Sequence, residues 1–407
     1  KLVDAITGET IPFCSIIIEN STNGTSSNEL GEFEFNTKIL PLKITISHIN
    51  YQSQSILVDD SNTNLEIKLT PISTVLDEVI LNSRKNKRDL YAINLAKKAF
   101  RKISIAAKNR NNYGKAFYRQ KTKSNNDFTE FSEIIYDTRY NLGGIESWGI
   151  LEGRYALKEA SVNNKNFTRF SQLLKSFQPD TDDLIFPLHK NLDDYYDVRV
   201  SEVYSKDNAK IAVLSFTPHK FVKKPIFKGE AYINTNTNEV LKISGFINKD
   251  DFQFIKFTEK NATKKNYNLT FDIAFKKDSD LQNVIDYINV NQTFDYYNNE
   301  EFQTKIETNS NLFFFEYYTP TSRKKLGGQF KRNQSDWTKL NQIGYNKKFW
   351  EENPIVRRTP VEEEVIAAFD KTNSFESIFL NSKNQISSLS SKLYEDPFII
   401  SFDQNVR

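Results

Sequence analysis

The sequence is poor in the residues that catalysis and membrane insertion usually need. Its 407 residues include three histidines, one cysteine and no methionine. A single cysteine excludes an internal disulfide and any metal site built from several cysteines. No apolar run reaches the roughly 18 residues of a membrane-spanning helix. The missing initiator methionine is expected of a trimmed mature chain.

Catalytic motifs are also missing. His48, His189 and His219 lie in different regions, and none has the H-x-x-E spacing that a zinc carboxypeptidase needs. The chain has no G-x-S-x-G elbow, no G-x-x-x-x-G-K-[ST] phosphate loop and no G-x-G-x-x-G motif. We therefore expect no catalytic residue, no metal and no nicotinamide or nucleotide cofactor. A glycosidase needs only two carboxylates, so the 52 acidic residues leave that class open.

The sequence also has little excess of either positive or negative charge. Lys and Arg total 55 against 52 Asp and Glu, a net charge of +3 with both signs interspersed. Nucleic-acid binders usually carry a concentrated basic face, so we expect no nucleic-acid partner. The hydrophobic fraction of 38% and the aromatic fraction of 13% are typical of a chain with a folded core.

Short strands separated by turn signals fill the first 70 residues. Asn23-Gly24 is a strong hairpin signal, and Gly31 sits where a turn requires positive φ. Strands at this regular spacing predict a small β-sandwich. We place this domain at residues 1–72 and expect a charged linker at 73–88.

Three blocks in this region carry a family resemblance: residues 7–13 (TGETIPF), 24–33 (GTSSNELGEF) and 44–51 (ITISHINY). Together and in this order they resemble the carboxypeptidase-D regulatory-like domain, a module common at the front of Bacteroidota envelope proteins. The resemblance implies a transthyretin-like sandwich of the seven-stranded type, with no peptidase activity of its own.

The rest, residues 89–407, is predicted to be a β-rich domain with a few packed helices. Apolar residues at helical spacing predict a helix near 89–108. Long alternating segments between 198 and 318 predict a large, curved antiparallel sheet with one packed face and one wet face. The fold class is thus mainly β with some helix (α+β), and the element order is similar to outer-membrane folds of the lipoprotein-carrier type.

A second helix is predicted near 360–370. Thr359 is a good N-cap, Pro360 suits the first helical position, and Glu362 completes a capping box. Residues 142–196, by contrast, are the least periodic part of the chain.

Aromatic residues cluster in the C-terminal half and indicate a binding surface. Side chains alternate across a strand, so Phe313, Phe315 and Tyr317 should face one way and Phe314 and Tyr318 the other. One row should be core, and the other should form a partner surface or lie beneath another element. The candidate partner surface comprises Tyr296, Tyr297, Phe314 and Tyr318.

These observations predict a non-enzymatic accessory or scaffold protein in the periplasm, associated with the bacterial outer membrane. Its partner would be an outer-membrane protein or complex for protein assembly, secretion or uptake, with membrane association peripheral or through that partner. A glycan-directed envelope hydrolase with unidentified carboxylates is one alternative. The other is an outer-membrane β-barrel, against which the many Lys, Asp and Asn residues on both faces of strands 198–318 argue.

Overall fold

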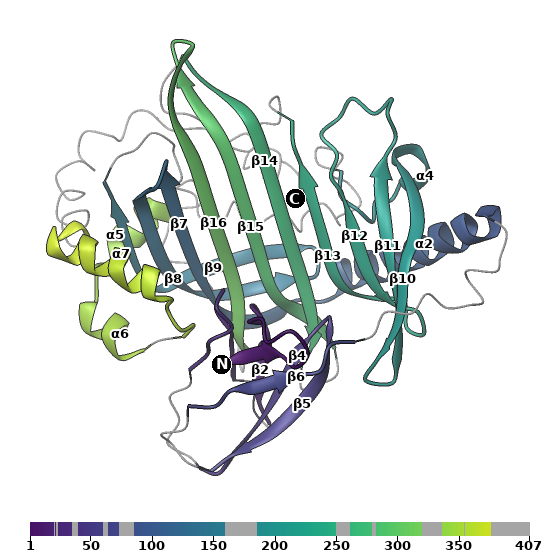
Figure 1. Cartoon of the computed structure of the whole chain (residues 1–407), viewed down its shortest axis with the longest axis horizontal. Helices are drawn as coiled ribbons and strands as arrows, with labels where there is room; N and C mark the ends of the chain where they lie inside the picture. The colour runs from purple at the N-terminus through teal and green to yellow at the C-terminus, as the bar shows by residue number, and fades with distance from the viewer. Residues whose placement is uncertain are drawn as a thin grey trace.

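A computed structural model of the chain shows two β-rich parts in contact with each other (Figure 1). The N-terminal part contains six short strands, and the larger part contains one long sheet with its helices. Within the described ranges, no helix is long and apolar enough to cross a membrane. The structure describes residues 1–19, 21, 23–34, 40–59, 64–72, 85–158, 185–249, 261–278, 282–319, 336–353 and 355–375.

The N-terminal strands form two small sheets around one core. They are β1 (Leu2–Asp4), β2 (Ser15–Ile18), β3 (Gly24–Ser26), β4 (Leu42–His48), β5 (Tyr51–Val58) and β6 (Ile67–Leu69). One sheet has the order β3-β2-β4-β5, and β1 pairs in parallel with β6. Apolar residues of both sheets, with the buried Cys14, pack together. The described residues thus contain six strands where the resemblance implied seven.

The larger part is built on a ten-stranded antiparallel sheet in the order β10-β11-β12-β13-β14-β15-β16-β7-β8-β9. β7 follows β16 because the two strands pair from Ile306↔Ser124 to Tyr318↔Tyr113. The strands are β7 (Asn112–Ser124), β8 (Asp127–Asn141), β9 (Gly144–Leu157), β10 (Tyr196–Lys206), β11 (Ala209–Pro218), β12 (Lys228–Asn234), β13 (Glu239–Ile247), β14 (Ala262–Lys277), β15 (Asn283–Asn298) and β16 (Glu301–Tyr318).

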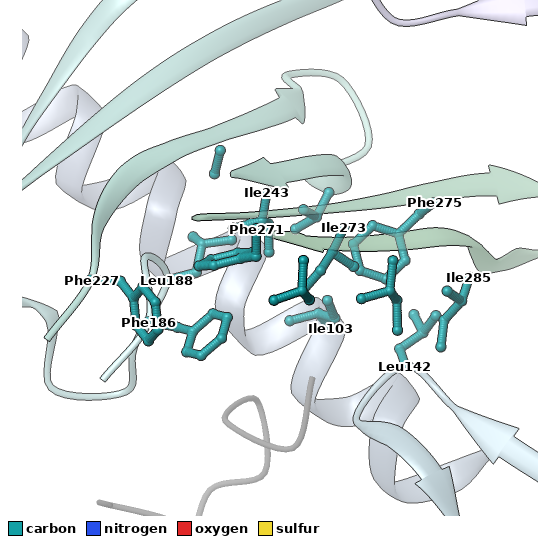
Figure 2. Packing of buried hydrophobic residues seen from close by; sticks show 14 of the residues in the cluster. Ile103, Leu142, Phe186, Leu188, Phe227, Ile243, Phe271, Ile273, Phe275 and Ile285 are labelled. Atoms are coloured by element: carbon teal, nitrogen blue, oxygen red, sulfur yellow. The ribbon is translucent and has the colours of Figure 1, made fainter. Parts of the chain in front are cut away.

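Five helices in the described ranges accompany this sheet, and the longest defines what we call its inner face. They are α2 (Lys85–Asn109), α4 (Leu192–Tyr195), α5 (Asp336–Ile343), α6 (Lys347–Glu352) and α7 (Pro360–Lys371). The buried side of α2 is mostly alanine, which allows a close approach to the sheet. Figure 2 shows Ile103 of this helix near Ile273, with Phe271, Phe186 and Phe227 in the same core.

The opposite, outer face is covered at both ends, contrary to the prediction of one wet face. Helix α6 packs Trp350 on Phe117 and Ile135, and α7 packs beside it on β8 and β9. The N-terminal part lies against the lower ends of the long strands (Figure 1), where Thr25 Oγ1 donates to the Ile355 carbonyl at 2.7 Å. The middle of the outer face lies between these two covered regions.

Most predicted elements are present, with shifted ends. The first helix begins at Lys85 instead of near residue 89. Most of the predicted linker lies outside the described residues. Strand β9 falls in the segment that showed least periodicity. The C-terminal helix has the predicted capping box: Thr359 Oγ1 accepts from the Glu362 amide, and the Glu362 carboxylate accepts from the Thr359 amide.

Gly31 tests whether the N-terminal core depends on one left-handed turn. It has φ +69°, and a Cβ placed there would lie 2.6 Å from the Leu2 carbonyl oxygen. Gly8 has a similar φ of +73° with nothing within 4 Å, so it is the matched control. We expect Gly8→Ala to lower the free energy of unfolding by about 1 kcal/mol and Gly31→Ala by about 2–3 kcal/mol. Equal losses in urea unfolding would show that the close approach to Leu2 is unimportant.

Candidate functional site

The four aromatic residues predicted as a partner surface do not form one exposed patch. Phe314 is 0% exposed and Tyr296 is 4% exposed, and both belong to the inner-face core. Tyr297 and Tyr318 are partly exposed. Phe314 and Tyr296 are therefore core residues and not surface anchors, contrary to the prediction.

Side chains alternate along β16 as far as Phe314, which lies on the inner face with Leu312, and the strand is irregular beyond it. A β-bulge lies between Phe314 and Glu316 in the pairing with β7, and a bulge changes which way the following side chains point. Phe313 is buried as well as Phe314, since the sheet is covered on both faces here. Phe315 packs with Trp350 of α6 on the outer face.

The two partly exposed tyrosines lie far apart. Tyr318 is the last residue of β16, whereas Tyr297 pairs with Phe302 near the beginning of that strand. At about 3.3 Å per residue, the ends of this strand are about 50 Å apart. The Tyr318 hydroxyl donates to Asp137, and its ring lies 6.1 Å from that of Tyr113. Tyr318 is thus held against the sheet by these contacts. Of the four residues predicted as a partner surface, Tyr297 is the one that still suits that role.

Tyr297 belongs to the tip of a projecting hairpin. Strands β14, β15 and β16 rise above the rest of the sheet (Figure 1), and Asn299 and Glu300, both with positive φ, join β15 to β16. This is the backbone that a tight two-residue hairpin turn requires. The Tyr297 and Phe302 rings meet edge to face at 5.7 Å, and Phe302 is 52% exposed. Lys265 places its Nζ 4.4 Å from the centre of the Tyr297 ring.

A buried ion cluster lies on the outer face of β7, β8 and β9. Arg119, Glu133 and Arg154 are directly opposite one another on these three strands. Arg119 Nε donates to Glu133 Oε1 at 2.8 Å, and Arg154 Nε donates to Glu133 Oε2 at 2.9 Å. The next link reaches α7, where Arg119 Nη1 lies 3.0 Å from Glu362 Oε2. Arg358 adds a further cation, 3.9 Å from Glu133.

The electrostatics of this cluster favour its ionised form. Burial alone would raise the pKa of Glu133, but Arg154 and Arg119 outweigh it and lower the pKa to about 2. Burial opposes ionisation of Glu362 too, and Arg119 with Lys121 holds its pKa below the usual value. Burial and the neighbouring arginines lower the pKa of Arg358. Glu133 is a carboxylate at neutral pH and has no proton to give, so it is unsuited to act as a general acid.

The same cluster connects to the N-terminal part through Lys121. Its Nζ lies 2.9 Å from Glu29 and 3.0 Å from Glu362, so it joins the N-terminal part to α7. A cavity of about 40 Å³ lies beside this bridge, between the N-terminal part and the outer face. Its lining combines aromatic side chains with polar ones and includes Phe13, Asn28, Glu29, Tyr287, Asn311 and Phe313.

The remaining candidates for catalytic chemistry are scattered. His48 lies 5.3 Å from the Tyr51 ring, and burial lowers its pKa to about 4. His189 is buried against Tyr195, and His219 lies in another loop. Within the described part of the chain, no group of three or more His, Cys, Asp or Glu residues could hold a metal ion.

Sequence reasoning missed the ion cluster and the hairpin tip for different reasons. Arg119 and Glu362 are 243 positions apart, and a single sequence holds no signal for such a contact. Phe302 could have been found, because counting outward from the Asn299-Glu300 turn places it opposite Tyr297.

Glu133 provides the first test of the cluster. We expect Glu133→Gln to lower the free energy of unfolding by about 3–5 kcal/mol, because it leaves buried arginines without their counter-charge. Glu32→Gln is the control, since Glu32 meets Arg357 at 3.6 Å in a more exposed pair and should cost under about 1 kcal/mol. Similar small losses for both variants in urea unfolding would contradict a structural role for the cluster.

The pH dependence of stability provides the second test. The folded pKa of Glu133, about 2, lies below the ordinary value of 4.5, so its contribution is complete above 4.5 and is lost as pH falls toward 2. The stability gap between the wild type and Glu133→Gln should therefore narrow from pH 6 to pH 2.5. A gap that stays constant, or widens in acid, would show that Glu133 is not held in its charged form.

Comparisons with solved structures give only weak likenesses. A DUF1329 family protein from Desulfovibrio piger is 9% identical with a TM-score of 0.25, covering 57% of this chain and 95% of that one. A LolA superfamily protein from Nitrosomonas europaea is 9% identical with a TM-score of 0.21, covering 57% and 94%. A putative membrane-associated protein of unknown function from Bacteroides fragilis is 10% identical with a TM-score of 0.13, covering 78% and 97%. These scores are too low to establish a common fold.

The family comparison is more specific. No curated protein matches the chain. The model of the CarboxypepD_reg-like domain matches residues 1–81, which contain all three blocks on which the resemblance was based. The match includes the six short strands and leaves the ten-stranded sheet outside it. The N-terminal part of this chain is a CarboxypepD_reg-like domain.

Proposed function

We propose that this protein is a non-enzymatic accessory subunit on the periplasmic side of a bacterial outer membrane, docked on a larger outer-membrane protein complex. The observation that carries the proposal is the tip of the β15–β16 hairpin. It presents Tyr297 and the half-exposed Phe302 at the end of a long projection. Aromatic side chains bury large areas at little entropic cost, which makes them frequent anchors of protein interfaces.

The surroundings of the tip support a protein partner. Lys265 lies over the Tyr297 ring, and two acidic residues follow nearby: Glu300 in the turn and Glu301 at the start of β16. An apolar centre with charged groups at its edge is the usual composition of a protein interface. The stiff two-residue turn fixes the anchors before binding, and such preorganisation lowers the entropic cost of association.

The other features of the chain are consistent with a supporting role. The ionised groups on the outer face are engaged with one another, Glu133 between two arginines and Lys121 between two glutamates. The N-terminal domain belongs to a type that is common in envelope proteins and has no peptidase activity of its own. Association with the membrane would follow from the partner.

Capture of the partner tests the proposal. We expect the double variant Tyr297→Ala, Phe302→Ala to weaken capture of an outer-membrane protein from native envelopes at least about tenfold, as loss of an aromatic anchor does. Its melting temperature should hardly change, because both residues lie at an exposed tip. Capture should also survive high salt, since screening weakens charge-driven contacts far more than apolar ones.

A second exposed aromatic supplies the control. Phe221 is 73% exposed in the segment between β11 and β12, so Phe221→Ala should leave capture unchanged. Equal loss in both variants would point to nonspecific adhesion. Full capture by the double variant would refute docking through the hairpin tip.

A further inference from the structure

Four asparagines form a closed ring of hydrogen bonds in the middle of the outer face. They occupy an N-x-N pattern on each of two neighbouring strands, with Asn289 opposite Asn311 and Asn291 opposite Asn309. Asn291 Nδ2 donates to Asn289 at 2.8 Å, Asn289 donates to Asn311, Asn311 donates to Asn309 at 2.9 Å, and Asn309 donates to Asn291 at 2.5 Å. Each side chain therefore donates once and accepts once within the ring.

This ring leaves half of its hydrogen-bonding capacity unused. A carboxamide has two N–H donors and two acceptor sites on its oxygen, and the ring employs one of each. Within the described part of the chain, these four side chains make no other hydrogen bond. Asn289 is buried, while Asn291, Asn309 and Asn311 are half-buried. The remaining donors and acceptors of Asn291, Asn309 and Asn311 thus lie at the partly exposed side of the ring.

The choice of asparagine is unfavourable for the sheet itself. Asparagine is depleted in strands, where β-branched and aromatic residues pack better. Four asparagines at neighbouring positions in two strands go against this residue preference of β-strands. Departures from such preferences are expected at functional sites. The same two strands carry the usual apolar residues on their inner side, such as Val290 and Leu312. The departure is therefore confined to the outer face.

An apolar cavity adjoins the ring. Asn311 belongs to both, and the cavity continues between Phe13, Tyr287 and Phe313. The Phe13 and Tyr287 rings lie 6.0 Å apart, and Phe13 has φ +55°, a rare backbone for a bulky residue. A volume of about 40 Å³ is far below that of a drug-sized pocket but has room for a group as small as a methyl.

Charge next to the ring is already neutralised. Arg119, opposite Asn311, is paired with Glu133 and Glu362, and Lys121, opposite Asn309, is paired with Glu29 and Glu362. The ring itself is uncharged. The site therefore favours a neutral ligand whose groups both donate and accept hydrogen bonds, as hydroxyl and acetamido groups do.

We propose that the asparagine ring and its cavity bind an N-acetylated sugar residue of a glycan chain. Paired strand positions give the ring dimensions of about 5 by 7 Å, close to the face of one pyranose ring. The hydroxyls and the acetamido N–H and C=O groups pair with the free amide groups, and the acetyl methyl enters the aromatic cavity. An extended peptide would place only a single pair of residues over an area of this size. The proposal does not depend on docking through the hairpin tip.

Two oligosaccharides that differ only in the acetamido group test this assignment by calorimetry. Chitotetraose should bind the full chain, and cellotetraose should bind at least about tenfold more weakly, because it lacks the methyl that fills the cavity. The double variant Asn291→Ala, Asn309→Ala should lose at least about tenfold in affinity for chitotetraose. Asn268→Ala should bind as the wild type does. Asn268 belongs to β14, where it lies opposite Thr293 of β15 and outside the ring.

The outcomes separate clearly. Binding of neither oligosaccharide at millimolar concentration would overturn the proposal, as would unchanged affinity in the double variant. Equal affinity for both oligosaccharides would refute the role of the cavity. If the double variant fails to fold, Asn311→Asp keeps the side-chain size and should still weaken binding by placing a charge in a neutral site. Its melting temperature, measured alongside, shows whether that loss comes from the site.

Discussion

The arrangement of the outer face depends on the ion pairs that the Glu133 carboxylate makes with its neighbouring arginines. This carboxylate lies between two arginines in a row that crosses three strands, and the same arginine that binds it also binds Glu362 of α7. Taking so many charges out of water is costly, and apolar residues often stabilise a core as well or better. What the cluster contributes, we infer, is position. Lys121 pairs with Glu362 of the C-terminal helix and with Glu29 of the N-terminal domain, and so ties both to the sheet.

That placement shapes the accessible surface of the protein. The inner face carries α2 and the main apolar core, while α6, α7 and the N-terminal domain cover the two sides of the outer face. Between them the asparagine ring and its cavity lie in the middle of the sheet, and the β15–β16 hairpin projects beyond it (Figure 1). The two features are well separated and make different demands on a ligand. One offers neutral hydrogen-bonding groups, and the other offers aromatic rings for a protein surface.

The sequence was informative wherever the signal was local. The three blocks identified the N-terminal domain, Gly31 was recognised as a positive-φ turn, and Thr359 with Glu362 specified the start of α7. Long alternating segments predicted the β-rich sheet, although β9 was overlooked because Gly144, Gly149 and Gly153 interrupt its apolar pattern. Helix α2 begins four residues earlier than its apolar spacing implied, since its first turns are polar.

Contacts between distant segments could not be read in the same way. Phe313 and Phe314 are both buried because other elements pack on both faces of the sheet, which the alternation of β16 does not reveal. The asparagine ring was visible as two N-x-N patterns, but their meaning depends on the register that brings them together. The ion cluster joins residues from three strands, a helix and another domain. A periodic pattern describes one helix or strand, whereas this cluster depends on contacts among five separate parts of the chain.

The claim that the hairpin tip contacts a membrane partner can be tested directly in living cells. A photo-reactive phenylalanine analogue placed at position 302 should crosslink to an outer-membrane protein, because that side chain would be buried in the interface. The same analogue at position 221, where the natural phenylalanine is even more exposed, should give no such product. A crosslink from 221 and none from 302 would contradict the account.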